Sequence, residues 1–336
     1  MIYKRILRPL LFSFDAEAVH HFTLSMLRHT PLASMIALGH PPPQDPVELW
    51  GLRFPNRIGA AAGLDKNALA VPAWQKLGFG FIEVGGVTPK PQKGNPRPRI
   101  FRCLKEEGII NCMNFPNHGV EAMAGRLKAY REQTANKHFD FPIGINMSKG
   151  SDTPVEGAAD DYLLLLEKLF PYSDFFVVDI SCPNTPGMCD LQTKDKEFTS
   201  HILNVVQTFN RQQPKRKPIL TKLSPDLAPH QLEQMLEIVL AYELDGVIAT
   251  NTTTDHSAVS LKQKGGLSGK PLRAKSTEMI RAIYRQTQGK LPIIGVGGIF
   301  SRDDYLEKLD TGATLVQLYT GLVYEGPRIV HRLLKA

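Results

Sequence analysis

Eight short apolar runs recur along the chain from about residue 56, and polar or amphipathic segments separate them. In segments such as 162–170, 232–240 and 279–284, the apolar residues recur at helical spacing. Continuous apolar strands that alternate with helices predict parallel strands buried on both faces. Eight such units favour a (β/α)8 TIM barrel, in the α/β class. A doubly wound open sheet is the alternative, which is less favoured because no GxGxxG motif opens a helix after the first strand. The predicted strands are 58–62, 81–87, 142–147, 175–180, 219–223, 246–250, 293–296 and 315–319.

The first 40 residues carry a different pattern, which predicts three short amphipathic helices. Asp15 is placed to cap the second helix, and Pro31 separates the second helix from the third. These helices are too small to form a core of their own, so they either pack on the main domain or present apolar surface to a bilayer interface. Three prolines at 41–43 then make a stiff linker. We expect a helical extension over 1–40 and a barrel over 41–336.

Composition narrows the class of protein. The chain has 336 residues, of which 42% are hydrophobic and 22% are charged, an ordinary soluble composition with room for one barrel of about 250 residues and an appendage. No run approaches the ~18 uninterrupted apolar residues of a membrane span, and the start lacks the cleavage site of a secretory signal. The 4 cysteines show no CxxC pair and no zinc-like spacing with histidine, so we expect reduced thiols and no metal site.

The charge of the chain indicates what kind of partner it binds. A net charge of +7 suits an anionic substrate, a phosphate-bearing cofactor or a membrane surface. We expect no nucleic-acid partner, because there is no basic helix and no ladder of basic and aromatic residues. The proline-rich stretch between Glu83 and Glu106 carries basic residues and no acidic ones, and it predicts a loop. This loop is either simply solvated or faces an anion or a lipid surface.

Polar residues at the ends of the predicted strands carry the candidate chemistry, because a (β/α)8 barrel keeps its functional residues at the carboxyl ends of its strands. Cys182 follows the fourth strand, where it is either a buried structural cysteine or a proton acceptor. Lys66, Asn146 and Lys222 lie at the ends of the first, third and fifth strands, and 251–253 (Asn-Thr-Thr) follows the sixth. Together they predict a polar, cationic mouth that takes an anionic heteroaromatic ligand.

Glycines dominate the last third of the chain, at 265–269, 295–299 and 321. The second group follows the seventh strand and Gly321 follows the eighth. Glycines at those places free backbone N–H groups to hold a phosphate, which is the usual phosphate site of this barrel. The pattern therefore predicts a phosphate-bearing cofactor.

Seven motifs in a fixed order resemble those of the dihydroorotate dehydrogenase family, and the resemblance covers nearly the whole chain. The extension, with Asp-Ala-Glu-Ala-Val-His-His-Phe over 15–22, resembles the membrane-associated, quinone-reducing class 2 branch of that family. The motifs lie at 61–66, 98–102, 144–146, 181–187, 249–253, 265–272 and 295–299.

The resemblance implies an enzyme that oxidises dihydroorotate to orotate in pyrimidine synthesis, with FMN in the barrel mouth and a membrane quinone entering between the N-terminal helices. Cys182 would be the catalytic base. The residues implied for dihydroorotate are Lys66, Asn111, Phe115, Asn184, Asn251 and Thr252. The residues implied for FMN are Ala62, Gly63, Lys66, Gly86, Asn146, Asp179, Lys222, Thr250, Gly269, Gly298, Tyr319 and Thr320.

Several residues around the expected substrate depart from the family pattern. Class 2 members usually carry Ser where this chain has Cys182, and the family typically has Asn where this chain has Asp179. An ionised carboxylate donates no hydrogen bond and repels an anionic ligand. Asp179 must therefore be protonated, pair with Lys66 or Lys222, or face a ligand of different charge. The other departures are Gly86, Asn114, Pro116 and Ser148, where the pattern has Thr, Gly, Asn and Gly.

Two alternatives to dihydroorotate oxidation follow from these departures. One is a flavoenzyme of the same barrel that acts on a different, less anionic dihydropyrimidine. The other is a flavin-binding protein that has lost turnover. The location implied by the resemblance is peripheral, on the cytoplasmic face of an inner membrane through residues 1–40. The absence of a presequence favours a bacterial over a mitochondrial membrane.

Overall fold

The computed structural model describes residues 2–29, 45–135, 141–184, 188–193 and 195–335. The predicted third helix after Pro31 and the proline linker at 41–43 lie outside these residues.

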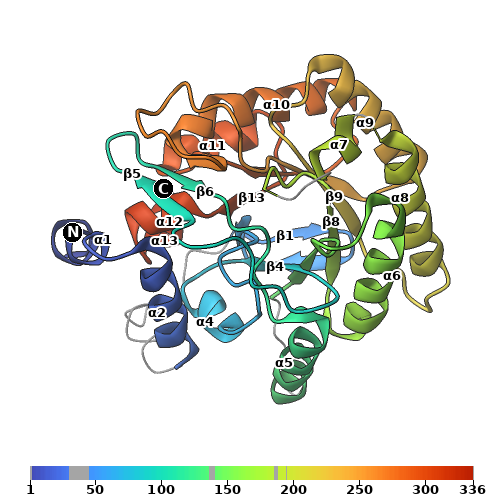
Figure 1. Cartoon of the computed structure of the whole chain (residues 1–336), viewed down its shortest axis with the longest axis horizontal. Coiled ribbons are helices and arrows are strands. Elements are labelled where there is room, and N and C mark those ends of the chain that lie inside the picture. The colour runs from blue at the N-terminus through green and yellow to red at the C-terminus, as the bar shows by residue number, and fades with distance from the viewer. Residues whose placement is uncertain (1, 30–44, 136–140, 185–187, 194, 336) are drawn as a thin grey trace.

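The described chain forms a closed barrel of eight parallel strands with helices around its outside (Figure 1). Each predicted apolar run supplies one strand, so the (β/α)8 barrel is confirmed and the open sheet is not found. Around the barrel the strand order is β3, β4, β7, β8, β9, β10, β12, β13 and back to β3. The bounds are β3 Ile58–Ala60, β4 Phe81–Val87, β7 Ile143–Met147, β8 Phe175–Asp179, β9 Ile219–Leu223, β10 Gly246–Ala249, β12 Ile293–Val296 and β13 Leu315–Leu318.

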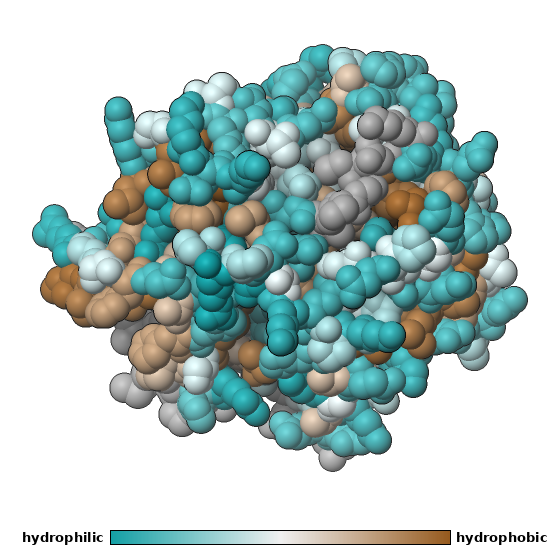
Figure 2. Space-filling view, viewed as in Figure 1, coloured by the Kyte–Doolittle hydropathy of each residue, from teal (hydrophilic) through white to brown (hydrophobic). Residues whose placement is uncertain are grey.

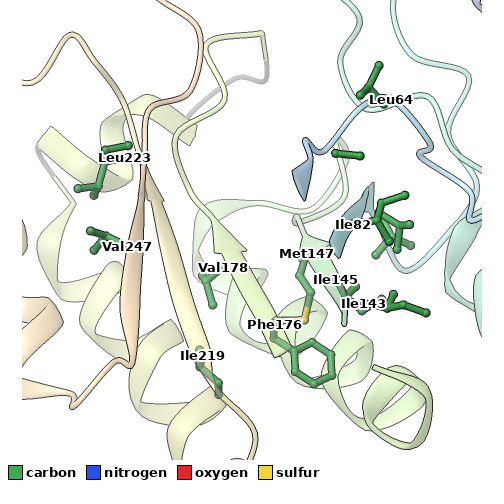
Figure 3. Packing of buried hydrophobic residues seen from close by; sticks show 14 of the residues in the cluster. Leu64, Ile82, Ile143, Ile145, Met147, Phe176, Val178, Ile219, Leu223 and Val247 are labelled. Carbon is green, nitrogen blue, oxygen red and sulfur yellow. The ribbon is translucent and has the colours of Figure 1, made fainter. Parts of the chain in front are cut away.

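The helices that cover the barrel form where the apolar spacing changes to the helical period. The predicted helical segments fall in α6, with the single-turn helix η3 at its end, in α9 and in α10. Side chains such as Ile145, Phe176 and Val178 lie in the layer between strands and helices (Figure 3). The helices are α4 Val71–Lys76, α5 Gly119–Thr134, α6 Ala158–Leu169, α7 Met188–Thr193, α8 Lys196–Arg211, α9 Pro229–Ala241, α10 Arg273–Gln286, α11 Arg302–Asp310, α12 Thr320–Glu325 and α13 Ile329–Leu334, with single turns η2 Val155–Gly157, η3 Phe170–Tyr172 and η4 Lys270–Leu272.

Two small antiparallel sheets, which the sequence did not predict, lie outside the barrel. The hairpin β1 (Val47–Leu49) and β2 (Leu52–Phe54) packs against the apolar cluster inside the barrel. The other sheet has the order β11 (Gly266–Gly269), β6 (Gly108–Asn111) and β5 (Ile100–Cys103). Part of the basic stretch predicted as a loop is therefore β5, and the first glycine group forms β11.

The N-terminal extension forms a π-helical turn, η1 (Tyr3–Leu7), followed by the helices α1 (Arg8–Phe12) and α2 (Ala16–Arg28). Asp15 caps α2 as predicted, because its carboxylate accepts a hydrogen bond from the Ala18 N–H at 2.8 Å. One face of α2 is buried against the rest of the protein. The helix therefore packs on the main domain, which was the first of the two alternatives for the extension. The exposed apolar residues of the extension gather at one edge of the molecule (Figure 2) and include Ile2, Ile6, Leu7, Leu10, Phe14 and Phe22. No helix in the described part is long and apolar enough to cross a membrane.

Alternate residues of each barrel strand face inward. On several strands these inward residues change from apolar to polar towards the carboxyl end. On β4 the inward position changes from Phe81 to Glu83, and on β9 it changes from Leu220 to Lys222. The amino-terminal end is filled by aromatic rings that lie against strand glycines. An added Cβ at Gly144 would lie 2.1 Å from the ring of Phe175.

This packing predicts that Gly144→Ala is costly. The ring of Phe175 is fully buried and cannot move away, so we expect the free energy of unfolding in urea to fall by about 2–3 kcal/mol. Gly125→Ala is the matched control, because Gly125 is exposed on α5 with open space at its Cβ position. We expect that control to raise the free energy of unfolding by ~0.5–1 kcal/mol. Equal stability of the two variants would contradict the packing.

Candidate functional site

A cavity opens at the carboxyl ends of the barrel strands, with an empty volume of about 1100 Å³ that includes the solvent at its mouth. All of the site residues predicted from the sequence line this cavity. They are Ala62, Gly63, Lys66, Gly86, Asn111, Phe115, Asn146, Asp179, Cys182, Asn184, Lys222, Thr250, Asn251, Thr252, Gly269, Gly298, Tyr319 and Thr320. Their placement agrees with the prediction, while the role of each stays a prediction.

The inner end of the cavity contains a buried polar network that centres on Glu83. This carboxylate on β4 has 0% exposure, and the sequence analysis gave it no role. It accepts hydrogen bonds from Asn146 Nδ2 and Gln317 Nε2, each at 2.7 Å, and Lys222 Nζ lies 3.8 Å from it. A buried charge requires such partners. The signal that would have found Glu83 is a single acidic residue inside an apolar strand.

Asp179, at the end of β8, is surrounded by hydrogen-bond donors. Its Oδ1 accepts from Ser181 N (3.1 Å), Ser181 Oγ (2.8 Å) and Asn251 Nδ2 (3.4 Å), and its Oδ2 accepts from Asn146 Nδ2 (3.2 Å). Among the described residues no ion pair joins Asp179 to Lys66 or Lys222, and Lys222 is paired with Glu83 instead. Lysine pairing, one of the three alternatives for Asp179, is therefore not found, and neutral donors hold this carboxylate.

Cys182 lies directly after that strand and lines the cavity with 8% of its surface exposed. Tyr162 fixes the strand end because its hydroxyl donates to the backbone carbonyl of Asp179 at 2.7 Å. Two amides predicted to contact substrate are also linked, because Asn184 Nδ2 donates to Asn111 Oδ1 at 3.2 Å. Cys182 thus lines the same cavity as these two linked amides.

Lys66 supplies a titratable positive charge at the same cavity. Burial lowers the pKa of its ammonium to about 8, although the charge of Glu17 opposes that shift. The ammonium donates a hydrogen bond to the carbonyl oxygen of Gly63 at 2.7 Å. A bound anion would favour the charged form, so Lys66 suits a ligand with a carboxylate or phosphate.

The glycines after the seventh strand allow a chain path that other residues rarely adopt. Gly297 has φ +125° and Gly298 has φ +74°, both outside the range that side-chain residues favour. An added Cβ at Gly298 would also lie 2.3 Å from Cβ of Arg273. Nearby, the hydroxyl groups of Ser268 and Thr320 are 2.8 Å apart. Backbone and hydroxyl groups therefore line this side of the cavity, as expected of a phosphate site.

Comparison with known proteins agrees with this geometry. The sequence model of the family described as dihydroorotate dehydrogenase matches residues 46–336. The chain belongs to the dihydroorotate dehydrogenase family. Dihydroorotate dehydrogenase (quinone) of Thermosynechococcus vestitus is 46% identical over 360 residues, which cover 99% of this chain and 95% of that protein. The protein of the same name from Cronobacter sakazakii is 44% identical over 338 residues, 98% of each chain.

Solved structures of dihydroorotate dehydrogenase have the same fold. The crystal structure of the Eimeria tenella enzyme in complex with ferulenol has a TM-score of 0.86 and 32% identity, and the match covers 95% of this chain and 90% of that one. Its ligand-free form has a TM-score of 0.84, and the match covers 94% of this chain and 92% of that one.

Departures from the dihydroorotate dehydrogenase pattern meet in this cavity. An added Cβ at Gly86 would lie 2.5 Å from the ring of Phe115, so the ring occupies the space that a side chain at residue 86 would need. Asn114 and Phe115 both have positive φ, 55° and 47°. Ser151 Oγ donates to the side-chain oxygen of Asn114 at 3.2 Å. The ring of Phe115 therefore lies against Gly86, while Asn114 is held by Ser151.

A second, mainly apolar cavity lies between the N-terminal helices and the barrel. Its empty volume is about 1870 Å³ including the solvent at its mouth, and its walls include Val19, Leu24 and Leu27 of α2. Ile100, Ile109 and Tyr319 line both cavities, so the two adjoin. His20 also lines it, and burial followed by the charge of Lys66 lowers the pKa of His20 to about 3. This histidine is therefore neutral at physiological pH.

A buried ion pair holds α2 against the barrel. Glu17 on α2 is 2% exposed and Arg99 is 5% exposed, and Arg99 Nη2 lies 2.7 Å from Glu17 Oε1. Arg99 also donates to the backbone carbonyls of Lys93 and Asn95, both at 2.7 Å. Burial alone would raise the pKa of Glu17, but hydrogen bonding to Arg99 and its charge lower that pKa below its ordinary value of 4.5.

This pair predicts a pH-dependent contribution of Glu17 to stability. A lowered pKa stabilises the folded protein above the ordinary pKa, and this contribution is lost as the pH falls through the lowered pKa. At pH 7 we expect Glu17→Gln to reduce the free energy of unfolding by roughly 2–3 kcal/mol. This loss lies at or below the low end for a broken buried ion pair, because the glutamine amide oxygen still accepts a hydrogen bond from Arg99. The gap between wild type and variant should narrow below pH 4.5 in urea titrations.

The matched control is Glu121→Gln, because Glu121 pairs with Lys168 on the surface. Surface pairs contribute little, so this variant should follow wild type at every pH. A gap for Glu17→Gln that stays constant with pH would contradict the role of its charge.

Proposed function

We propose that this protein oxidises dihydroorotate to orotate in pyrimidine synthesis, with FMN as its cofactor and a membrane quinone as the electron acceptor. The observation that carries the proposal is the pair of adjoining cavities. One, which we call the polar cavity, contains charged and amide side chains such as Lys66 and Asn184 together with Cys182. The other is lined mainly by apolar residues and lies beside α2. Membership in the dihydroorotate dehydrogenase family supports the same reaction.

The residues of the polar cavity fit FMN. Among the described residues, Asn146 Oδ1 and Gln317 Oε1 are buried without a hydrogen-bond partner, and both residues line the cavity. Lys222 adds a positive charge beside them, and the glycine and hydroxyl groups at 297–298 and Thr320 suit a phosphate. FMN supplies a hydride acceptor when bound. Asn146, Lys222 and Gly298 would hold it, together with Ala62, Gly63, Lys66, Gly86, Asp179, Thr250, Gly269, Tyr319 and Thr320.

The substrate would bind between the cofactor site and the segment from Asn111, at the end of β6, to Phe115. Lys66 neutralises its carboxylate, and the linked amides of Asn111 and Asn184 orient its ring, with Asn251 and Thr252 beside them. Cys182 takes the C5 proton while a hydride leaves C6, which forms the double bond of orotate. A thiol has an ordinary pKa of about 8.5, so it is a better base near neutral pH than a serine hydroxyl.

The apolar cavity would receive the quinone, and the exposed apolar residues of η1, α1 and α2 would contact the lipid. Ile2 is 70% exposed and Ile6 is 62% exposed, at the edge of the molecule where this cavity lies. An amphipathic element of this kind lies in a bilayer interface without crossing it. We therefore place the protein as a peripheral protein on the cytoplasmic face of a bacterial inner membrane, with no nucleic-acid partner.

Anaerobic stopped-flow mixing with dihydroorotate tests the reaction. We expect fast bleaching of the bound yellow flavin, and Cys182→Ala should slow it by about 100-fold or more, because a general base typically contributes that much. Dithionite should reduce the flavin of both proteins equally. A flavin that dihydroorotate leaves oxidised, but that a neutral dihydropyrimidine reduces, would contradict dihydroorotate as substrate. Equal bleaching rates would contradict Cys182 as the base.

Asp179→Asn is expected to strengthen orotate binding. Like charges about 4 Å apart repel by ~4 kcal/mol at an effective dielectric constant of 20, so removing the carboxylate should lower the orotate Kd at least tenfold. The flavin absorbance change on titration with orotate measures this Kd. Asp303→Asn, an exposed change on α11, is the matched control and should leave the Kd unchanged. An unchanged or higher Kd in Asp179→Asn would contradict the charge argument.

A further inference from the structure

We propose that Glu83 is a positioning residue for the cofactor. It turns the side-chain amides of Asn146 and Gln317 so that their oxygen atoms accept hydrogen bonds from an N–H group of the bound flavin ring. This inference rests on the proposed FMN cofactor, and it assigns a task to two residues, Glu83 and Gln317, outside the predicted site.

The direction of both amides follows from the chemistry of a carboxylate, which accepts hydrogen bonds and donates none. Glu83 Oε1 lies 2.7 Å from Asn146 Nδ2, and Glu83 Oε2 lies 2.7 Å from Gln317 Nε2. Rotating either amide by half a turn would place an oxygen against the carboxylate, which is repulsive. Glu83 therefore fixes which end of each amide is left for a ligand.

Asp179 fixes Asn146 in the same direction. The second hydrogen of Asn146 Nδ2 points to Asp179 Oδ2 at 3.2 Å, so both hydrogens of this amide are directed to carboxylates. The departure of Asp179 from the family pattern thus has a physical consequence in this chain: it reinforces the orientation that Glu83 sets. The amide of Asn146 presents only its oxygen to a ligand.

Those oxygen atoms need a donor. Asn146 Oδ1 and Gln317 Oε1 are buried and have no partner among the described residues, although both residues line the cavity. An added Cβ at Gly86 would lie 3.0 Å from Asn146 Oδ1, so a side chain at residue 86 would crowd this oxygen. An unpaired buried acceptor is costly, and a ligand N–H removes that cost.

The flavin ring has a matching edge. Its pyrimidine part presents one N–H, at N3, between two carbonyl oxygens. An amide oxygen suits the N–H, and an ammonium group suits a carbonyl. Lys222 supplies that ammonium 3.8 Å from Glu83 and is 6% exposed. A glutamine at position 83 would not serve as well, because its own N–H groups would let the neighbouring amides turn over.

The test compares the Kd of FMN with the Kd of its N3-methyl analogue, which lacks this N–H, by quenching of flavin fluorescence on binding to the apoprotein. We expect wild type to bind FMN at least tenfold more tightly than the analogue. In Glu83→Gln this ratio should fall below threefold, because Gln317 can then turn and Asp179 alone is left to orient Asn146. If the methyl group acts only by steric clash, the ratio of the two Kd values should be the same in wild type and Glu83→Gln. A change of this ratio between the two proteins therefore reports amide orientation separately from fold stability.

Two further variants sharpen the comparison. Glu83→Asp keeps an acceptor-only carboxylate and should retain most of the wild-type ratio even if both affinities fall. Glu237→Gln makes the same chemical change on the exposed face of α9 and should match wild type. If Glu83→Gln keeps the same ratio of the two Kd values as wild type, the proposal is overturned.

Wild type alone can still overturn the inference if Glu83→Gln fails to fold. Equal binding of FMN and its N3-methyl analogue to wild type would overturn this inference while leaving FMN as the cofactor. Failure of wild type to bind FMN would overturn the proposed function, and this inference with it.

Discussion

Glu83 lies on a barrel strand with no exposure to solvent, and a buried carboxylate is destabilising unless donors surround it. The barrel supplies those donors from three other strands, as Asn146 on β7, Gln317 on β13 and Lys222 on β9. The apolar end of the barrel stabilises the fold, and this polar layer above it orients the groups that face the cavity. Asp179 extends the network to Ser181 and thus to the strand end that carries Cys182. The cavity is therefore organised from within the barrel as well as from its loops.

The two cavities explain why the N-terminal extension belongs to the working protein. The ion pair between Glu17 and Arg99 holds α2 against the segment before β5, and Val19, Leu24 and Leu27 of the same helix line the apolar cavity. Because Ile100, Ile109 and Tyr319 line both cavities, a ligand in each would be separated by a thin layer of side chains. In the proposed function, a polar substrate reduces the cofactor and an apolar substrate oxidises it, and the two substrates need not share a pocket.

Much of this arrangement could be predicted from the sequence, because buried parallel strands appear as continuous apolar runs and functional residues follow them. The positions of Cys182 and Lys66 at the cavity were predicted in this way, while their roles stay predictions. Glu83 and Gln317 were missed, because each is a single polar residue inside an apolar run and its importance depends on partners from distant strands. The sheet of β5, β6 and β11 was missed for a similar reason, since the pairing of β11 with β6 joins segments over 150 residues apart (Gly266 with Asn111). The surroundings of Asp179 required side-chain directions that no spacing specifies.

The central claim is that reduction and oxidation of the cofactor use separate, adjoining cavities, and Val19→Trp tests it most directly. Val19 lines only the apolar cavity, so a larger side chain there fills the proposed quinone space. Stopped-flow measurements would follow flavin reduction by dihydroorotate and then its oxidation by a short-chain quinone. The account predicts that reduction stays within twofold of wild type while oxidation slows at least tenfold. Oxidation at the wild-type rate, or equal slowing of both steps, would contradict it.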